Sequence, residues 1–329
     1  MTLIVQKFGG TSVATDYARQ SLLTQVNRCR NEGNDVVIVV SAMGRSGEPY
    51  ATDTLISLLE EINTNVSPRK KDLMLSCGEI ISCSLISHLL ETNNIPSEPL
   101  TGSQAGIITT NTFSNSEIIS IDTTKIEKYL KEGKVVVIAG FQGTTIEGEI
   151  TTLGRGGSDI SAVCIGGYLN ADRVDIYTDV LGIAKIDPRI VPTAPYMPTI
   201  MYDDMFKLAD HGAKIVHPRA VKIAQELGMP VRVRSTFSEY LGTLITGEVT
   251  KYDHKIVGFA LEKNMMYSEV FIVFDIAYKD EIKDYIQDFI ESSDIIPKDV
   301  IWGNGDVSLL FSTVNIVEIA RNLYSYLHE

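Results

Sequence analysis

The hydrophobic residues of this chain fall into short continuous runs separated by longer amphipathic stretches. Runs of β-branched residues without polar alternation are typical of strands buried on both faces of a parallel sheet. Such runs lie at 3–5, 36–40, 135–139, 174–177 and 231–233. Helical spacing predicts helices at 17–30, 54–62, 80–91, 123–131, 159–169, 202–208 and 220–227. The alternation predicts an α/β fold with an open, mainly parallel sheet between helix layers.

The pattern changes after Gly247. Strands are expected there at 255–261, 268–275, 299–303 and 307–312, with amphipathic helices at 279–292 and 315–327. This order is typical of a small α+β module of ferredoxin-like type. We therefore expect one domain over residues 1–247, a linker at Glu248–His254, and a second domain over residues 255–329.

Composition bounds the class of protein. With 329 residues, 44% of them hydrophobic, the chain can bury a large core and form two domains. No apolar run was found to approach the roughly 20 residues of a membrane span, and the start lacks the pattern of a signal peptide. Four cysteines without C-x-x-C spacing indicate reduced thiols and a cytoplasmic location. Five scattered histidines show no metal-ligand spacing.

The net charge of −13 shapes the expected partners. Acidic residues outnumber basic ones by 42 to 29, which disfavours nucleic acid or an anionic membrane as a partner. An anionic substrate would need a local cluster of positive charge.

The opening strand runs into the segment Lys7-Phe8-Gly9-Gly10-Thr11-Ser12. Glycines let backbone N–H groups approach an anion closely, and a lysine adds a mobile positive charge. Thr11 or Ser12 is a candidate cap for the helix that follows. An ordinary glycine turn is the alternative. The segment is neither a P-loop, whose lysine follows its glycines, nor a dinucleotide fingerprint.

Further glycine clusters follow other predicted strands, at 43–44, 140–143 and 154–157. In open α/β sheets, ligands bind beyond the carboxyl ends of the strands, so these loops are expected to converge on one pocket.

Several motifs in a fixed order carry a family resemblance. After the opening segment come Val40-Ser41-Ala42-Met43-Gly44, Ser76-Cys77-Gly78-Glu79, Thr152-Leu153-Gly154-Arg155-Gly156-Gly157-Ser158-Asp159, Tyr177-Thr178-Asp179-Val180, Asp187-Pro188-Arg189 and Gly212-Ala213-Lys214. Together, these motifs closely resemble those of aspartate kinases, which have the amino-acid kinase fold. Residues 43–53 are most similar to the diaminopimelate-associated type of Gram-positive bacteria. The resemblance covers residues 1–247.

The resemblance implies ATP-dependent phosphorylation of the β-carboxylate of L-aspartate to 4-phospho-L-aspartate, the first step toward lysine, diaminopimelate, threonine and methionine. Mg²⁺ would arrive bridging the ATP phosphates. The acceptor is already ionised at pH 7, so the obstacle is charge repulsion. Two like charges about 4 Å apart repel by roughly 4 kcal/mol at an effective dielectric near 20, which corresponds to about three decades of rate.

The resemblance also implies roles for individual residues. Lys7 would stabilise the transferring phosphoryl group, Asp159 would organise Lys7, Arg155 would bind a substrate carboxylate and Glu79 the α-ammonium group. It assigns further substrate contacts to Ser41, Thr52 and Ser158, and nucleotide contacts to Lys7, Gly9, Gly10, Thr11, Thr178, Asp179, Arg189 and Lys214. Local alternatives are a helix cap for Ser41, a helix-start carboxylate for Glu79 and a capping carboxylate for Asp159. His211 and His217 are expected to be packing or capping residues.

Two departures from the family pattern stand out. Ala184 occupies the place where the family usually has an aromatic residue near the nucleotide, so a stacking surface is lost. The charge and stem of Lys185 are expected to compensate partly for this loss. The tail after Gly247 suffices for a single ACT-like module, and its loop Asp275–Lys279 lacks a Pro-Gly-rich turn. We expect this module to serve mainly for homodimerisation, with weak or absent feedback inhibition. The alternatives are a sibling kinase with another acidic acceptor and a non-catalytic scaffold subunit.

Overall fold

The computed structural model describes residues 2–248, 252, 254–293, 296–312 and 315–327. The chain divides into two compact units, which are described separately. The first comprises Met1–Leu181 and Lys222–Leu244, and the second comprises Gly182–Val221 and Ile245–Glu329. The expected linker Glu248–His254 includes residues 249–251 and 253, which lie outside the described residues. The domain boundaries drawn from the sequence stay a prediction.

The first unit contains the predicted parallel sheet. Its neighbouring strands run in the order β11 (Val231–Ser235), β9 (Arg173–Thr178), β1 (Leu3–Phe8), β2 (Asp35–Val40), β6 (Val135–Ala139) and β3 (Ser97–Leu100). Every one of these pairings is parallel. The five β-branched runs therefore form strands as predicted. The short strand β3 (SEPL) carries no such run, and the sequence pattern missed it.

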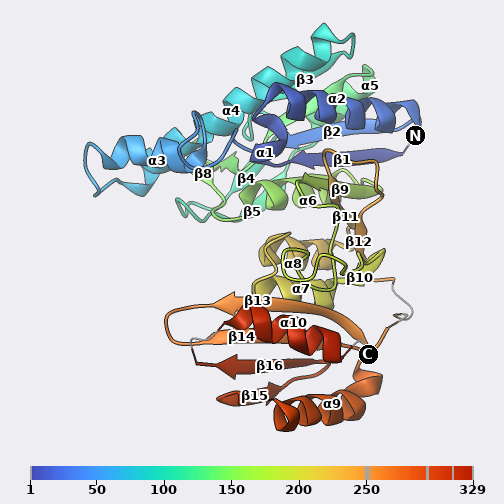
Figure 1. Ribbon diagram of the computed structural model, residues 1–329. Coiled ribbons are helices and arrows are strands. Elements are labelled where there is room, and N and C mark those ends of the chain that lie inside the picture. Colours follow the sequence, from blue (N-terminus) through green and yellow to red (C-terminus); the bar gives the residue numbers. More distant parts are fainter. Residues whose placement is uncertain (1, 249–251, 253, 294–295, 313–314, 328–329) are drawn as a thin grey trace. The chain divides into compact units, whose positions relative to one another are not determined.

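Helices cover both faces of this sheet. Ile4 and Phe8 on β1 pack with side chains of α2 (Asp16–Asn31) and α4 (Pro68–Thr92). Because side chains alternate along a strand, Lys7 points to the opposite face, where α6 (Gly157–Tyr168) contacts β1 and β9. Figure 1 shows α2 running beside β2. The α/β fold with helix layers is confirmed.

The unit also carries a second sheet that the sequence did not predict. Its strands run in the order β5 (Ile118–Ile121), β4 (Ile107–Thr109), β7 (Gln142–Thr144) and β8 (Ile150–Thr152). Strands of three or four residues, several of them threonine-rich, give too little periodicity to detect. The remaining helices, α3 (Thr52–Glu60) and α5 (Thr124–Lys131), lie within two residues of their predicted starts.

Helix α4 is much longer than predicted. It begins at Pro68, twelve residues before the expected start, and its most apolar 18-residue window has a mean hydropathy of 1.6. By length and composition alone it could cross a membrane, so the expectation that no apolar run approaches this length was wrong. Half of that window is buried, and Cys83, Ile86 and Leu90 pack into the core of the first unit.

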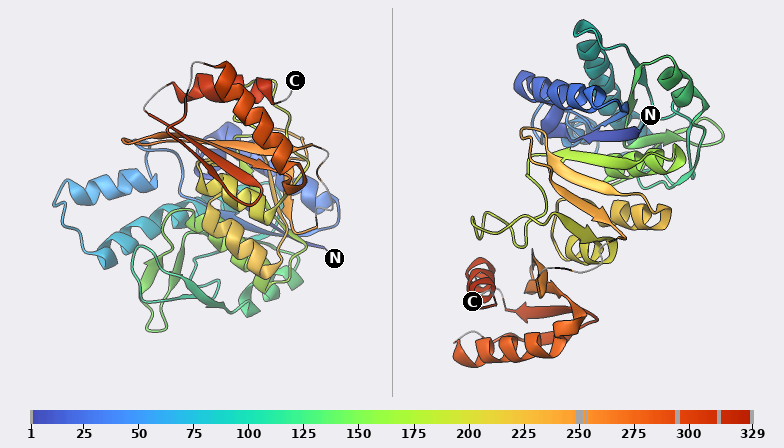
Figure 2. Two further views of the ribbon diagram at one scale, coloured as in Figure 1. Left: turned by 90° about the horizontal axis from the view of Figure 1, so that it is seen from below. Right: turned by 90° about the vertical axis from the view of Figure 1, so that its right-hand side faces the viewer.

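The second unit is built on a four-stranded antiparallel sheet. The strand order is β13 (Ile256–Lys263), β14 (Ser268–Phe274), β16 (Asp306–Phe311) and β15 (Asp299–Trp302). Helices α9 (Lys279–Ser292) and α10 (Ile316–Tyr326) lie beside this sheet in Figure 2. Their apolar side chains share one hydrophobic core with those of its strands. These elements match the predicted order within a few residues and are consistent with an ACT-like module.

The rest of the second unit precedes this sheet. It holds β10 (Thr199–Met201) and α7 (Tyr202–Asp210), while α8 (Pro218–Leu227) and β12 (Thr243–Thr246) cross the boundaries between the units.

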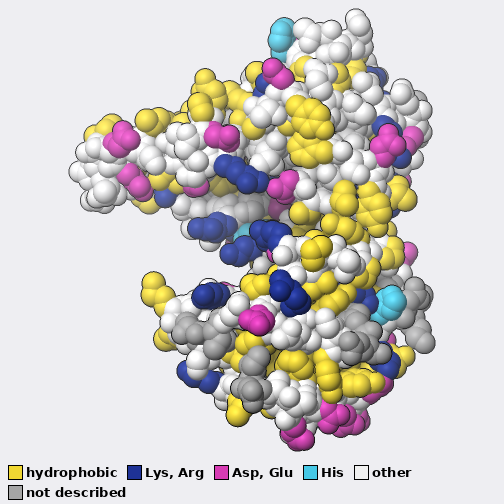
Figure 3. Space-filling model, viewed as in Figure 1, with side chains coloured by type: hydrophobic (Ala, Val, Ile, Leu, Met, Phe, Trp, Pro, Cys, Tyr) yellow, Lys and Arg dark blue, Asp and Glu magenta, His cyan; other side chains and the backbone are white. Residues whose placement is uncertain are grey.

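The acidic excess is concentrated in part on α9. This helix carries five acidic residues against two lysines, and acidic side chains gather at the lower edge of the face in Figure 3, where α9 lies in Figure 1. An anionic surface of this kind repels polyanions.

The entry to α2 differs from the prediction. Residues Gly10–Val13 form their own short helix, α1, and the cap of α2 is Thr15, whose side chain accepts a hydrogen bond from the Ala18 N–H at 3.1 Å. Ser12 instead bonds the Thr236 hydroxyl at 2.6 Å. The expectation that Thr11 or Ser12 caps α2 was therefore wrong, because the extra turn moves the cap downstream.

We predict that Thr15→Ala lowers the free energy of unfolding by about 1 kcal/mol, since an N-terminal amide loses its acceptor. Urea unfolding measures this loss. Thr24→Ala, at an exposed position inside the same helix, is the matched control and is expected to be close to neutral. Equal losses in the two variants would contradict the assignment of Thr15 as the cap.

Candidate active site

A cavity of about 610 Å³ opens in the first unit where β1 and β2 end and α6 begins. All seven residues predicted to act on the substrate or in catalysis line it, although they lie far apart in the sequence: Lys7, Ser41, Thr52, Glu79, Arg155, Ser158 and Asp159. Gly10 lines it as well. The fold therefore brings the predicted loops together at the carboxyl ends of parallel strands, as expected for a sheet of this type.

An ion pair joins two walls of the cavity. The Lys7 Nζ lies 2.8 Å from the Asp159 Oδ1, and both side chains are only about a tenth exposed, at 13% and 11%. Lys7 is the second-to-last residue of strand β1, and Asp159 is in the first turn of α6. The carboxylate fixes the position of the ammonium group, so Asp159 has a partner beyond its own helix.

Two glycines shape the backbone of the cavity. A Cβ on Gly10 would lie 2.7 Å from the Ala42 carbonyl oxygen, so no side chain fits where β1 enters α1. Gly156 has a φ of +71°, in the left-handed region, and stands at the N-cap of α6. Both glycines line the cavity, so the backbone itself forms part of its wall near the Lys7–Asp159 pair.

Glu79 is the most deeply buried acid of the cavity. It lies in the middle of α4 and is 2% exposed, so its interpretation as a helix-start carboxylate was wrong. Its Oε1 accepts a hydrogen bond from the Ala42 N–H at 3.0 Å, while its buried Oε2 has no hydrogen-bond partner among the residues that the structure describes. Burial raises the pKa of Glu79 to about 8. A cationic group placed beside Oε2 would supply the missing partner.

The remaining predicted substrate residues lie on the cavity wall. Ser41 follows β2 and its backbone N–H donates to the Phe8 carbonyl at 3.1 Å; it caps no described helix, because the N-cap of α3 is Ala51. Thr52 is the first residue of α3, and Ser158 lies in the first turn of α6. Arg155 is exposed, and no ion pair is found for its guanidinium within the described part of the chain.

The predicted nucleotide residues of the first unit lie at the adjoining strand ends. Thr178 closes β9, and Asp179 follows it and forms an ion pair with Arg45 at 2.9 Å. Gly9 lies against β9, since its N–H donates to the Tyr177 carbonyl at 3.3 Å. Thr11 is in α1. None of these four residues lines the 610 Å³ cavity itself.

Arg189 and Lys214 belong to the second unit. The Arg189 guanidinium is paired with Asp187 at 2.6 Å, and the hydrogen bonds from Arg189 lower the pKa of Asp187. Ala184 pairs with Tyr196 in an isolated antiparallel bridge, which places an aromatic side chain directly opposite the alanine. Whether these residues meet a nucleotide stays a prediction.

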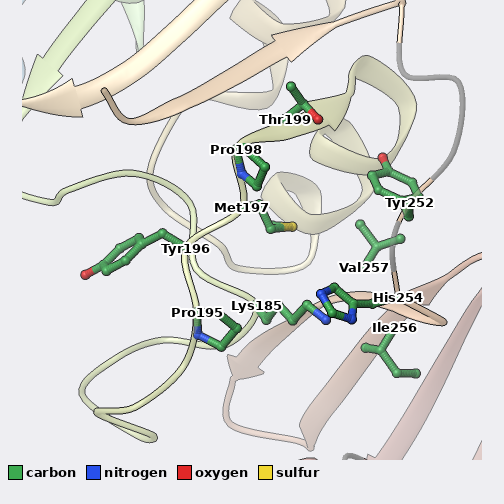
Figure 4. Close-up of a pocket in the computed structure, with 10 residues that line it drawn as sticks. All are labelled: Lys185, Pro195, Tyr196, Met197, Pro198, Thr199, Tyr252, His254, Ile256 and Val257. Atoms are coloured by element: carbon green, nitrogen blue, oxygen red, sulfur yellow. The ribbon is translucent and has the colours of Figure 1, made fainter. Parts of the chain in front are cut away.

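Lys185 lies in a separate cavity of the second unit, of about 100 Å³. It is only 4% exposed, and its side chain points toward His254 (Figure 4). Burial lowers its pKa. Ala184, Arg189 and Lys214 do not line this cavity. The predicted compensation by Lys185 at the nucleotide edge stays untested.

Sequence analysis missed two residues on α4. Lys71 lines the cavity, and Lys71, Leu75 and Glu79 are spaced by four, which places them on one face of the helix. Asp72 is fully buried and accepts hydrogen bonds from the backbone N–H and the hydroxyl of both Ser114 and Thr152, at 2.8–3.0 Å. Extending the helical spacing of four residues back from Glu79 would have found Lys71. No pattern in the neighbouring sequence indicates that Asp72 is buried.

The histidines behave as predicted. His211 stacks on Phe271 and bonds Glu269 at 3.1 Å, and His217 Nδ1 accepts the Arg219 N–H at 3.2 Å. Across the described residues, no group of three or more His, Cys, Asp or Glu side chains is placed to hold a metal ion.

Comparisons with known proteins agree with this geometry. The sequence profile of the amino acid kinase family matches residues 2–235. The chain is 47% identical over 246 residues to aspartokinase 1 of Bacillus subtilis (strain 168), covering 75% of this chain and 61% of that protein. It is 46% identical over 263 residues to the aspartokinase of Geobacillus stearothermophilus, covering 80% of this chain and 63% of that protein.

The crystal structure of aspartate kinase from Synechocystis superposes with a TM-score of 0.66 at 37% identity, covering 98% of this chain and 55% of that one. The chain thus spans about three fifths of the length of the curated relatives it matches.

We predict that the free energy of unfolding of the ligand-free protein falls as the pH rises from about 4.5 through about 8, relative to Glu79→Gln. Because the pKa of Glu79 is raised in the folded protein, its carboxyl group contributes stability that is fully present below the pKa of Glu79 in the unfolded chain. This stability is lost as the pH rises and the buried carboxyl group ionises. Urea unfolding of both proteins across this range measures the difference. Identical pH profiles would contradict the buried, unpartnered state of Glu79.

Proposed function

Because the chain belongs to the amino acid kinase family, we propose that it transfers a phosphoryl group from ATP to the β-carboxylate of L-aspartate, giving 4-phospho-L-aspartate. The observation that carries the proposal is the charge arrangement of the 610 Å³ cavity. Three cations line the cavity, Lys7, Lys71 and Arg155, together with three acids. Of these acids Asp159 is paired with Lys7 and Asp53 is exposed, whereas Glu79 is buried with its Oε2 unpartnered among the described residues. An amino acid with one ammonium and two carboxylate groups matches this arrangement.

Each side chain has a defined task in this reaction. The unpartnered Oε2 of Glu79 accepts the α-ammonium group, and Arg155 binds the α-carboxylate through its two-pronged guanidinium. The β-carboxylate is ionised at pH 7 and needs no general base. Lys7, held by Asp159, neutralises charge on the group in transfer, which is the main requirement of phosphoryl transfer.

Gly10 lines the cavity at the end of β1, and a glycine there lets the chain pass close to the Ala42 carbonyl beside the space proposed for the phosphates of ATP. Gly9, Gly10, Thr11, Thr178 and Asp179, all in the first unit, would hold the nucleotide. Mg²⁺ bound to the ATP phosphates would supply further charge neutralisation. A bond forms between the aspartate Oδ and the γ-phosphorus, the bond from that phosphorus to the bridging oxygen breaks, and ADP leaves.

We predict turnover with ATP, Mg²⁺ and L-aspartate, and a loss of about three decades in kcat for Lys7→Ala with the fold retained. A coupled ADP-release assay measures turnover, and circular dichroism checks the fold. Lys70→Ala, at the exposed neighbour of Lys71, is the control and should leave kcat unchanged.

The same assay with glutamate, N-acetylglutamate, carbamate and a nucleoside monophosphate tests the alternatives. Silence with aspartate and turnover with another acceptor would identify a sibling kinase. Absence of turnover with every acceptor, or unchanged turnover in Lys7→Ala, would contradict the proposed role of the cavity.

For the second unit, we propose a single ACT-like module that forms a homodimer and binds amino-acid effectors weakly or not at all. The loop where ACT modules commonly approach an effector is filled here by a 3₁₀ turn, Ile276–Tyr278, capped by the Asp275 side chain. The edge strand β15 carries the exposed Ile301, a surface suited to a second copy.

We expect sedimentation equilibrium to give twice the chain mass of 36.2 kDa, with no binding heat from lysine, threonine, methionine or diaminopimelate in calorimetric titration. No binding heat is expected because the 3₁₀ turn Ile276–Tyr278 leaves no glycine-rich backbone to which an effector could bind. Micromolar binding of any one of these amino acids would contradict the proposed loss of regulation.

A further inference from the structure

A second cavity of the first unit is lined by four arginines. It measures about 60 Å³ and lies between α2 and the strands β1, β9 and β11. Arg28 comes from α2, Arg173 from β9, and Arg232 and Arg234 from β11. Four guanidinium groups around one small cavity are unexpected in a chain with a net charge of −13.

This cavity is separate from the candidate active site. Gln6 lines it, whereas the next residue on β1, Lys7, points to the opposite face of the sheet toward α6. The two cavities share no lining residue. The arginines are therefore free of any role in the proposed phosphoryl transfer.

The carboxylates present do not balance these charges. Asp175, 1% exposed, bonds the Arg173 Nε at 2.8 Å and lies 3.8 Å from the Arg234 Nη1. Glu32 lies 3.5 Å from the Arg28 Nε. With two acids and four arginines on its walls, the cavity keeps an excess of two positive charges. Burial and the charge of Arg173 lower the pKa of Arg232, as expected for crowded cations.

The hydrogen-bonding groups of the cavity are also incomplete. Five buried atoms of its lining residues lack a partner within the described part of the chain: Gln6 Oε1, Gln25 Oε1, Arg28 Nη1, Arg234 Nε and Arg234 Nη2. Arg234 is 5% exposed, and its guanidinium rests over the Tyr177 ring at 5.4 Å. Buried donors without acceptors are rare and indicate a missing partner.

The donors and acceptors together select the ligand. Three unpartnered N–H-bearing atoms need an anion with several acceptor oxygens, and two glutamine oxygens need a donor. Hydrogen phosphate offers acceptors through its free oxygens and a donor for one of the two glutamine oxygens through its single P–O–H, whereas sulfate has no donor at neutral pH. A cavity of 60 Å³ has room for about four waters, which suits one tetrahedral ion but not a nucleoside attached to it.

We propose that the arginine cavity between α2 and β1, β9 and β11 binds one inorganic hydrogen phosphate ion. The ion neutralises the excess charge, completes the hydrogen bonds of Arg28 and Arg234, and fastens α2 to the sheet. Because α2 follows the Gly9–Val13 segment directly, the bound ion also steadies the loop beside the active-site cavity.

The test is thermal unfolding and calorimetric titration of the full chain in Hepes buffer near pH 7.5. Sodium phosphate is compared with sulfate and chloride at matched ionic strength. We expect one site, a saturable rise of the melting temperature with phosphate, and a smaller rise with sulfate. Binding only the folded state raises stability in proportion to the logarithm of ligand concentration.

Four variants locate the site. Arg28→Gln should weaken phosphate binding at least about tenfold, the cost of one charge-assisted hydrogen bond. Arg232→Gln should also weaken it, because it removes one of the four positive charges on the cavity wall. The same variant should raise the melting temperature in the absence of phosphate, because it removes the repulsion between the half-buried Arg232 and Arg173. Arg30→Gln, on the same helix but outside the cavity, and Lys7→Ala, in the active site, should keep the full phosphate effect.

Several results would overturn the proposal. Equal shifts with chloride, a dissociation constant above about 10 mM, or a phosphate effect lost in Lys7→Ala but kept in Arg232→Gln would each do so. A shift produced by AMP that Arg232→Gln abolishes would show that the cavity takes a phosphate ester and would overturn the assignment to the free ion.

Discussion

The ion pair between Lys7 and Asp159 is the contact on which the candidate site depends. It joins the end of β1 to the start of α6 across 2.8 Å, with both side chains largely removed from water. An ion pair in this position holds its geometry only when the backbone on both sides is fixed. Gly10 and Gly156 provide that backbone, one by close approach to the Ala42 carbonyl and the other by its left-handed conformation.

Two separate cavities of the first unit, on the two faces of β1, are each lined by several lysine or arginine side chains. Lys7 faces α6 and the large cavity, while Gln6 faces α2 and the arginine cavity. A protein with a strong acidic excess repels anions at long range, so local clusters of this kind are what make anion binding feasible. Glu79 adds a buried carboxyl group to the large cavity. Its Oε2, unpartnered among the described residues, suits the ammonium group of an amino acid and distinguishes this site from one for a simple phosphate.

Most elements of the fold could be predicted from the sequence because their patterns are local. The run Val36–Val40 is apolar at every position, which marks a strand covered on both faces. The start of α4 could not be predicted, since Arg69, Lys70 and Lys71 interrupt the apolar pattern before Glu79. The N-cap of α2 was predicted too early in the chain, because the short helix α1 precedes α2. The strands that contain Thr109 and Thr151 have three residues each, which is too few to show a hydrophobic periodicity.

The sequence by itself determined the α/β class and the order of the motifs, because these depend on residue type and on spacing within single elements. The seven side chains that line the large cavity were predicted through the family resemblance that the motifs carry. Only the tertiary structure decided which charges lack partners. Neighbours that lie up to about two hundred residues away in the chain decide whether a charged side chain is paired. This holds for Asp72, for the Oε2 of Glu79 and for the arginine cavity, which Arg28, Arg173, Arg232 and Arg234 line. Burial and pairing are properties of packed surfaces, and no local pattern encodes them.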